Sequence, residues 1–352
     1  MKPTIEEKLG QLFIVRFHGK EITDELISLI RDYHIGGVAL YYCNYSSYDE
    51  MQNLINEIKR INSLYNKTPI FIAIDQEGGR VNRLPKEFKN LPVANKLTSD
   101  IELVKESGQI IGEILNDIGV RFCFAPVLDI QRFKDNHAIG DRCYGRNSKD
   151  VTTNGIAMMN ELKKNVLCAV KHFPGHGMFK RDSHIFLVGT TKNISKTTDI
   201  IPFEEAIKEG TPAIMVGHIM VRRMDNIYPA SLSKKVIKEF LIKKLGYNGL
   251  IVTDDLKMKA ISIIYGYKRA TLKAVEAGNT NILIGAKYNN VMKCLDYIKK
   301  RINPELEEDI NNAYNKVISA KKKYKLNDEP KKPINIEKYN KRIQRIRDIV
   351  LK

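Results

Sequence analysis

The stretch IFIAIDQEGGRVNR at residues 70–83 joins an unbroken apolar run directly to a group of charged and polar residues. Seven further short apolar runs occur along the chain, at residues 12–15, 37–41, 122–127, 167–170, 213–216, 250–252 and 281–284. None of these runs alternates apolar with polar residues, which is typical of parallel strands that are covered on both faces. The pattern therefore predicts eight buried parallel strands.

Amphipathic segments separate these runs. Residues 49–63, 100–117, 150–165 and 233–245 carry apolar side chains at helical spacing, and Ser231 or Ser233 can cap the last of them. Strands that alternate with helices predict an α/β fold, a (β/α)8 TIM-type barrel. The alternative is a doubly wound open sheet, but the first predicted strand is not followed by the GxGxxG motif that is typical of that fold.

We expect the barrel to form a catalytic domain over residues 1–286 and a short basic helical extension to follow over residues 287–352. Residues 321–352 contain 12 Lys and Arg against 4 Asp and Glu, so this tail carries a large part of the net charge of +17. We interpret the tail as solvated helices packed against the barrel. A nucleic-acid-binding arm is the alternative, but no RNA-binding motif accompanies the charge, and we expect no nucleic-acid partner.

The composition indicates an ordinary globular enzyme, with 43% hydrophobic and 28% charged residues in 352. The cysteines are odd in number and without a CxxC pair, which argues against a disulfide framework or a structural zinc site. The sequence has no signal-peptide pattern and no apolar span long enough for a membrane helix. We therefore expect a cytoplasmic monomer that does not insert into membranes. The cysteines are Cys43, Cys123, Cys143, Cys168 and Cys294.

Charged and polar side chains follow directly after several of the apolar runs. Asp75 ends one run, Asp129 follows a second, Lys171 and His172 follow a third, and Asp254 follows a fourth. In a barrel of this kind the residues at the carboxyl ends of the strands form the catalytic site. Burying so many charged groups without a role would be costly. We therefore predict a polar active site at this end of the barrel.

These segments resemble glycoside hydrolase family 3, and specifically its β-N-acetylglucosaminidase (β-hexosaminidase) branch that acts on cell-wall fragments. The resemblance lies in IAIDQEGGRVNRL, FAPVLDI, IGDRCYGR, KHFPGHG with a downstream DSH, PASLS and LIVTDDLKM, between about Glu6 and Gly285. It implies a retaining exo-enzyme that hydrolyses terminal β-linked GlcNAc from peptidoglycan-derived or chitin-type oligosaccharides. It implies no cofactor.

The resemblance also implies the roles of individual residues. Asp254 is the expected nucleophile, and His184 paired with Asp182 is the expected acid/base dyad. A dyad of this kind is chemically reasonable because neutral histidine has a pKa of about 6.5 and a carboxylate stabilises its charged form. Because successive strand residues face opposite ways, we expect Asp255 to cap the next helix or form a salt bridge there. The expected sugar-binding residues are Asp75, Arg83, Arg142, Lys171 and His172.

Three other interpretations remain open or are weaker. The same residues would serve a β-N-acetylglucosaminide phosphorylase, since a neutral histidine does not repel phosphate. A non-enzymatic protein could bind anionic polymers through its basic tail, but the intact set of motif residues argues against it. His172 and His176 have the HxxxH spacing of a zinc site, but Phe173-Pro174-Gly175 between them is incompatible with a helix, and we expect no metal. Cys43 stands where the resembled family has an arginine, so one outer sugar contact is in doubt.

Overall fold

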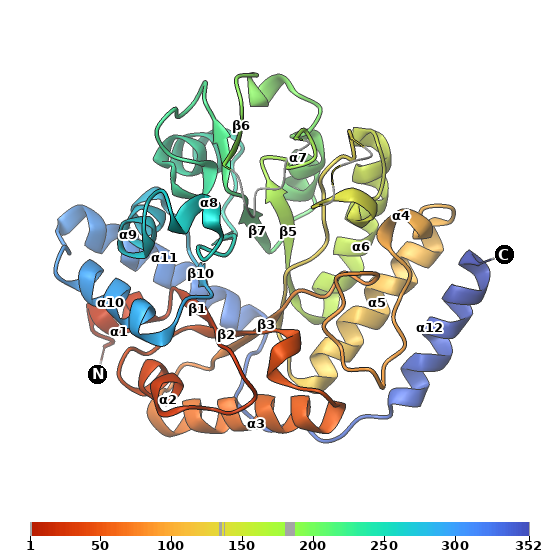
Figure 1. Cartoon of the computed structure of the whole chain (residues 1–352), viewed down its shortest axis with the longest axis horizontal. Coiled ribbons are helices and arrows are strands. Elements are labelled where there is room, and N and C mark those ends of the chain that lie inside the picture. Colours follow the sequence, from red (N-terminus) through yellow and green to blue (C-terminus); the bar gives the residue numbers. More distant parts are fainter. Residues whose placement is uncertain (1, 134–135, 137, 180–186, 352) are drawn as a thin grey trace.

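The computed structural model describes residues 2–133, 136, 138–179 and 187–351. Eight parallel strands form one sheet in the order β10-β1-β2-β3-β4-β5-β7-β9, with helices around it (Figure 1). All eight apolar runs predicted as strands are found in this sheet. The strands are β1 (Phe13–Arg16), β2 (Gly37–Leu40), β3 (Phe71–Ile74), β4 (Phe122–Cys123), β5 (Leu167–Phe173), β7 (Ala213–Val216), β9 (Leu250–Thr253) and β10 (Ile282–Ile284).

The two ends of the sheet meet, so the sheet closes into a barrel. A parallel bridge joins Val252 to Asn281, and the Thr253 N–H donates to the Asn281 carbonyl at 3.0 Å. On the other side β10 pairs with β1 in parallel, with Phe13 opposite Ile282. The predicted (β/α)8 barrel is therefore confirmed, and the doubly wound open sheet is excluded. A separate two-stranded parallel sheet, β6 (Val188–Thr190) with β8 (Ile219–Val221), was not predicted.

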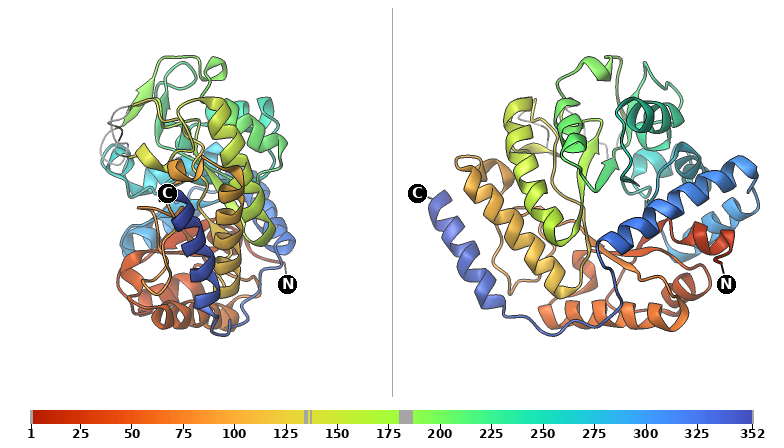
Figure 2. Two further views of the ribbon diagram at one scale, coloured as in Figure 1. Left: turned by 90° about the vertical axis from the view of Figure 1, so that its right-hand side faces the viewer. Right: turned by 180° about the vertical axis from the view of Figure 1, so that it is seen from behind.

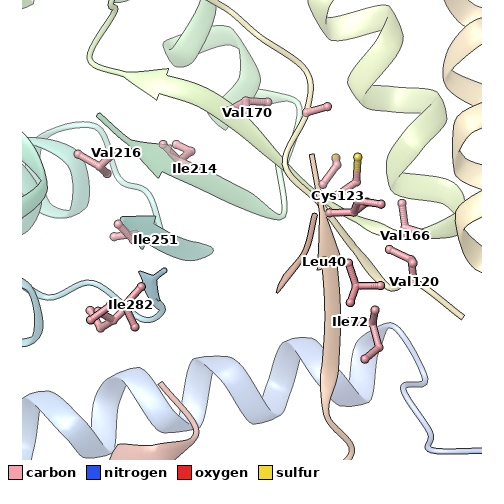
Figure 3. Close-up of a cluster of buried hydrophobic side chains, with 14 of the residues drawn as sticks. Leu40, Ile72, Val120, Cys123, Val166, Val170, Ile214, Val216, Ile251 and Ile282 are labelled. Carbon is pink, nitrogen blue, oxygen red and sulfur yellow. The ribbon is translucent and has the colours of Figure 1, made fainter. Parts of the chain in front are cut away.

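Strand residues alternate between two apolar clusters, as the period of a β-strand requires. In β7, Ala213 and Met215 belong to a cluster inside the barrel, whereas Ile214 and Val216 belong to the larger cluster beneath the surrounding helices. Figure 3 shows ten labelled members of the larger cluster on neighbouring strands and their flanking segments. Because both faces are covered, the strands contain unbroken apolar runs.

Helices connect successive strands, and polar caps fix where several of them begin. Ser47, Asp100 and Asn147 each accept a hydrogen bond from a backbone N–H in the first turn of the helix that follows, and Ser233 accepts from the Val236 N–H at 3.2 Å. The α-helices are α1 (Ile5–Gly10), α2 (Asp24–Arg31), α3 (Tyr48–Tyr65), α4 (Ala94–Leu97), α5 (Ile101–Ile118), α6 (Ser148–Asn165), α7 (Ile201–Lys208), α8 (Lys259–Ser262), α9 (Tyr267–Ala277), α10 (Tyr288–Lys299), α11 (Pro304–Lys323) and α12 (Ile336–Val350). Short 3-10 helices are η1 (Tyr42–Asn44), η2 (Gly140–Arg142), η3 (Ile194–Lys196) and η4 (Ala230–Leu232), and η5 (Lys235–Lys244) is a π-helix.

The C-terminal helices pack against the barrel. α10 lies against α9 and α2, and α12 lies along α5. In the right-hand view of Figure 2, which shows the molecule from behind, α11 lies across the near side of the barrel. Arg342 of α12 pairs with Glu113 at 2.6 Å, so part of the positive charge of the tail is neutralised on α5. The division between a catalytic domain and an extension at residue 286 stays a prediction. No helix in the described part of the chain is long and apolar enough to cross a membrane.

A buried lysine ties α11 to the amino ends of the strands. Lys321 is almost fully buried, and its Nζ donates to the Gln11 side-chain oxygen at 2.8 Å and to the carbonyls of Gly36 and Pro69 at 3.0 and 2.7 Å. Burial lowers the pKa of Lys321 to about 7. The acceptors lie just before β1, β2 and β3, and Nζ also lies 4.7 Å from the centre of the Phe71 ring. α11 therefore closes the amino-terminal end of the barrel.

We expect Lys321→Ala to lower the free energy of unfolding by about 3 kcal/mol, because it empties a buried site and leaves the buried side-chain oxygen of Gln11 and the half-buried carbonyl of Pro69 without this donor. Lys322→Ala is the matched control, since Lys322 is exposed on the same helix. Chemical denaturation followed by circular dichroism measures both. Equal midpoints for the two variants would show that this contact does not hold the helix in place.

Candidate active site

A cavity of about 280 Å³ opens at the carboxyl ends of the strands. Phe124, Met215 and Leu283 belong both to its wall and to the apolar interior of the barrel, so the filled interior closes the cavity from below. Six residues expected at the site from sequence line this cavity. They are Asp75, Arg83, Arg142, Lys171, His172 and Asp254. The other two, Asp182 and His184, lie outside the described residues.

The ammonium group of Lys171 lies at the centre of the charged side chains. Lys171 is on β5 and only 2% exposed, and its Nζ lies 2.7 Å from Asp75 Oδ1 and 2.6 Å from Glu77 Oε1. Burial alone would lower the pKa of Lys171, but the two carboxylates outweigh burial and raise the pKa above its usual value. Lys171 therefore remains a cation.

Glu77 connects Lys171 to Arg142 from behind the cavity wall. The Arg142 guanidinium donates to both Glu77 oxygens at 2.7 Å, and its remaining NH1 donates to the Ala138 carbonyl at 2.7 Å. Burial favours the protonated form of Glu77, but Arg142 and Lys171 outweigh it and hold the pKa of Glu77 well below its usual range. The pair is bidentate, so it fixes the plane of the guanidinium as well as its position.

A buried carboxylate orients His172. Asp129 has no exposed surface, and its Oδ2 lies 2.7 Å from His172 Nδ1 while its Oδ1 accepts from the His176 N–H at 2.6 Å. Burial raises the pKa of Asp129, but His172 and the backbone donor more than offset it, so that the pKa is lowered. An ionised Asp129 accepts the Nδ1 proton, which leaves Nε2 of His172 as the nitrogen for a ligand in the cavity.

Two arginines pack on one tyrosine ring in the wall of the cavity. The guanidinium carbons of Arg16 and Arg83 lie 4.0 and 4.3 Å from the centre of the Tyr41 ring. Arg16 and Tyr41 were not predicted at the site, although each stands at the end of an apolar run, as Asp75 does. Glu77 and Asp129 were not predicted to be the carboxylates that support Lys171 and His172.

The two consecutive aspartates after β9 have different surroundings. Asp255 is buried and pairs with Arg16 of β1 at 2.7 Å, and its other oxygen accepts from the backbone N–H groups of Lys257 and Gly285. The salt bridge expected of Asp255 therefore exists, but its partner is on β1 rather than in the following helix. Both Asp254 and Asp255 contribute to the cavity wall, because β9 ends at Thr253 and strand alternation no longer applies.

The cavity combines groups that donate and groups that accept hydrogen bonds. Carboxylates, an ammonium, guanidinium groups and an imidazole together suit a ligand with several hydroxyl groups, such as a sugar. Such a cavity at the carboxyl end of a closed (β/α)8 barrel is the usual place of an active site in this fold. The fold and the site together define a class of barrel enzymes that act on polyhydroxylated substrates.

Comparison with known proteins identifies the family. Residues 4–320 match the Glycosyl hydrolase family 3 N terminal domain. A β-hexosaminidase of Methylobacillus flagellatus is 32% identical over 277 residues, which cover 76% of this chain and 78% of that protein. A β-hexosaminidase of Haemophilus influenzae is 31% identical over 297 residues, which cover 81% and 82%.

A solved structure agrees with this result. The family 3 β-N-acetylglucosaminidase of Paenibacillus sp. FPU-7 superposes with a TM-score of 0.90 at 32% identity, over 98% of this chain and 68% of that one. The chain belongs to glycosyl hydrolase family 3, as its motifs imply, and it is a glycoside hydrolase.

We expect Glu77→Gln to lower the free energy of unfolding by about 3 kcal/mol or more, because it leaves the buried charges of Lys171 and Arg142 only partly compensated. The matched control is Glu205→Gln, which removes an equally short pair with Lys208 on an exposed helix face. Chemical denaturation of both variants measures the difference. If both variants unfold at the same denaturant concentration, Glu77 does not hold the two cations.

Proposed function

We propose that this chain is a retaining exo-β-N-acetylglucosaminidase that releases terminal β-linked GlcNAc from peptidoglycan-derived or chitin-type oligosaccharides. The observation that carries the proposal is the position of Asp254 in the wall of a cavity that also presents Asp75, Lys171 and His172. The names of the related β-hexosaminidases support the choice of sugar. A cavity closed from below suits an enzyme that takes the end of an oligosaccharide.

In the proposed reaction, a carboxylate oxygen of Asp254 attacks the anomeric carbon and the bond to the leaving oxygen breaks. His184 gives its proton to that oxygen as the bond breaks, and a covalent glycosyl–Asp254 intermediate forms. Water then attacks the same carbon, His184 takes the proton from this water, and Asp254 is released. Two inversions give net retention of configuration.

Asp182 has a positioning role in the proposal. Its carboxylate would hold the imidazole of His184 in one tautomer and stabilise the imidazolium that forms when the histidine takes a proton. Because Asp182 and His184 are two residues apart, an extended backbone would put their side chains on the same side.

The sugar itself would be bound by Asp75, Arg83, Arg142, Lys171 and His172. Lys171 and Arg142 are suited to charge-assisted hydrogen bonds with hydroxyl groups, because their carboxylate partners keep both in a fixed place. His172 would present Nε2, and Asp75 would accept from a hydroxyl group.

A cytoplasmic location is part of the same proposal. All five cysteines are free thiols, four of them buried and Cys43 half-buried. Free thiols suit a reducing compartment such as the cytoplasm.

A second candidate is a β-N-acetylglucosaminide phosphorylase, because a neutral histidine as proton donor does not repel a phosphate nucleophile. The charge of the cavity wall does not decide between the two reactions, because Arg16, Arg80 and Arg142 are each paired with a carboxylate. Product analysis with and without phosphate separates the two reactions, because a phosphorylase yields GlcNAc 1-phosphate and a hydrolase yields GlcNAc.

We expect Asp254→Ala to reduce turnover of a nitrophenyl β-GlcNAc substrate to nearly nothing while the melting curve is unchanged, because the nucleophile is missing. Added azide should restore part of the activity and yield the α-glycosyl azide. Asp348→Ala, on the exposed face of α12, is the control for loss of a carboxylate. Wild-type turnover in the Asp254 variant would rule out this nucleophile.

We expect His184→Ala to slow natural disaccharides far more than nitrophenyl substrates, because nitrophenolate leaves without a proton and a sugar does not. General acid catalysis is worth about 10²–10⁴-fold, which bounds the difference. Asp182→Asn should show the same trend more weakly. The ratio of rate losses on the two substrates measures the effect, and equal losses on both would assign the proton to another residue.

A further inference from the structure

Three strongly exposed isoleucines lie at the same end of the barrel as the cavity. Ile263 is 74% exposed, Ile227 is 62% exposed and Ile264 is 55% exposed. Ile227 follows β8, whereas Ile263 and Ile264 follow α8 in the segment after β9. These three side chains, called the isoleucine patch here, have no part in the proposed hydrolysis.

Two tyrosines hold the two segments of the patch together. The Tyr265 hydroxyl donates to the Ile227 carbonyl at 2.7 Å, and the Tyr228 and Tyr265 rings lie 5.8 Å apart. Arg269 adds a hydrogen bond to the Tyr228 hydroxyl at 3.1 Å. These contacts therefore hold the two segments that contain the exposed isoleucines against each other. Met258, just before α8, lines the catalytic cavity, so the patch lies near the cavity.

The surroundings of the patch are strongly basic. Residues 222–228 and 257–269 are all described, and within them the exposed charged side chains are Arg222, Arg223, Lys257, Lys259, Lys268 and Arg269. Asp225 is the one acidic residue in these two segments, and it is buried. Its carboxylate accepts hydrogen bonds from the backbone N–H groups of Ile227 and Tyr228 and from the Ser233 hydroxyl. The exposed charge here is therefore of one sign.

We propose that this face docks on the surface of an anionic lipid bilayer. Aliphatic side chains among lysines and arginines are the composition of surfaces that lie in a bilayer interface, where the apolar groups enter the acyl boundary and the cations meet the headgroups. The patch suits a bilayer better than a polysaccharide, because isoleucine has neither a hydrogen-bonding group nor a ring face to offer a sugar. It suits a second copy of this chain poorly, because two faces of the same charge repel each other.

The test is co-sedimentation of the full chain with vesicles made of equal parts phosphatidylglycerol and phosphatidylcholine, and with vesicles of phosphatidylcholine alone. We expect binding to the anionic vesicles at low salt, at least about tenfold weaker binding to the neutral ones, and weakening by added salt. The variant Ile263→Ser/Ile264→Ser should lose about tenfold or more in vesicle binding.

A second variant and two controls separate the causes. Lys259→Ser/Lys268→Ser should lose about thirtyfold, since each of the two cations near such a surface is worth about 1 kcal/mol. Leu64→Ser and Lys322→Ser/Lys323→Ser alter exposed residues elsewhere and should bind as wild type does. Melting curves verify that each variant is folded.

Several results would overturn the proposal. They are no binding to anionic vesicles, equal binding to neutral vesicles, and wild-type binding by both patch variants. Sedimentation with insoluble anionic cell-wall polymer but not with vesicles would also overturn it, and would assign the patch to that polymer. Concentration-dependent self-association that the isoleucine variant abolishes, without vesicle binding, would assign the patch to a second copy.

Discussion

The ammonium group of Lys171 is enclosed by the barrel, and two carboxylates within hydrogen-bond distance stabilise its charge there. These carboxylates are Asp75, which follows β3, and Glu77. Both carboxylate oxygens of Glu77 also accept hydrogen bonds from the guanidinium of Arg142. These two cations and two carboxylates sum to zero charge, so the group as a whole can stay buried. Because its members come from β5, from the loop after β3 and from η2, their charges fix three separate segments around one cavity.

The opposite end of the barrel is closed by another buried lysine. Lys321 of α11 binds backbone and side-chain oxygens just before three strands, and apolar side chains fill the interior between the two lysines. The barrel is therefore filled with side chains and open at one end, and the six described residues expected to meet a substrate lie at that end. This arrangement agrees with the action on chain ends in the proposed function.

The sequence predicted the strands well because each is a short apolar run, and it predicted six cavity residues because each follows such a run or lies in a recognisable motif. It did not predict the partner of Asp255, because Arg16 is 239 residues away and pairing across a closed barrel leaves no local signal. Lys321 looked like one of many basic residues in the tail, and only its packing distinguishes it. The β6–β8 pair escaped prediction because β6 contains Gly189 and Thr190 instead of an unbroken apolar run, and only two residues separate β8 from the end of β7. Asp182 and His184 lie outside the described residues, so their roles rest on the motif.

In the proposed reaction, Asp254 forms a covalent bond to the sugar. The most direct measurement is to trap the intermediate with a fluorinated, slowly hydrolysed GlcNAc derivative, digest the protein and locate the added mass by tandem mass spectrometry. We expect one added sugar on the peptide that contains Asp254, and none in Asp254→Asn. A sugar on a different carboxylate, or turnover of the derivative with inverted configuration and no labelled peptide, would contradict it.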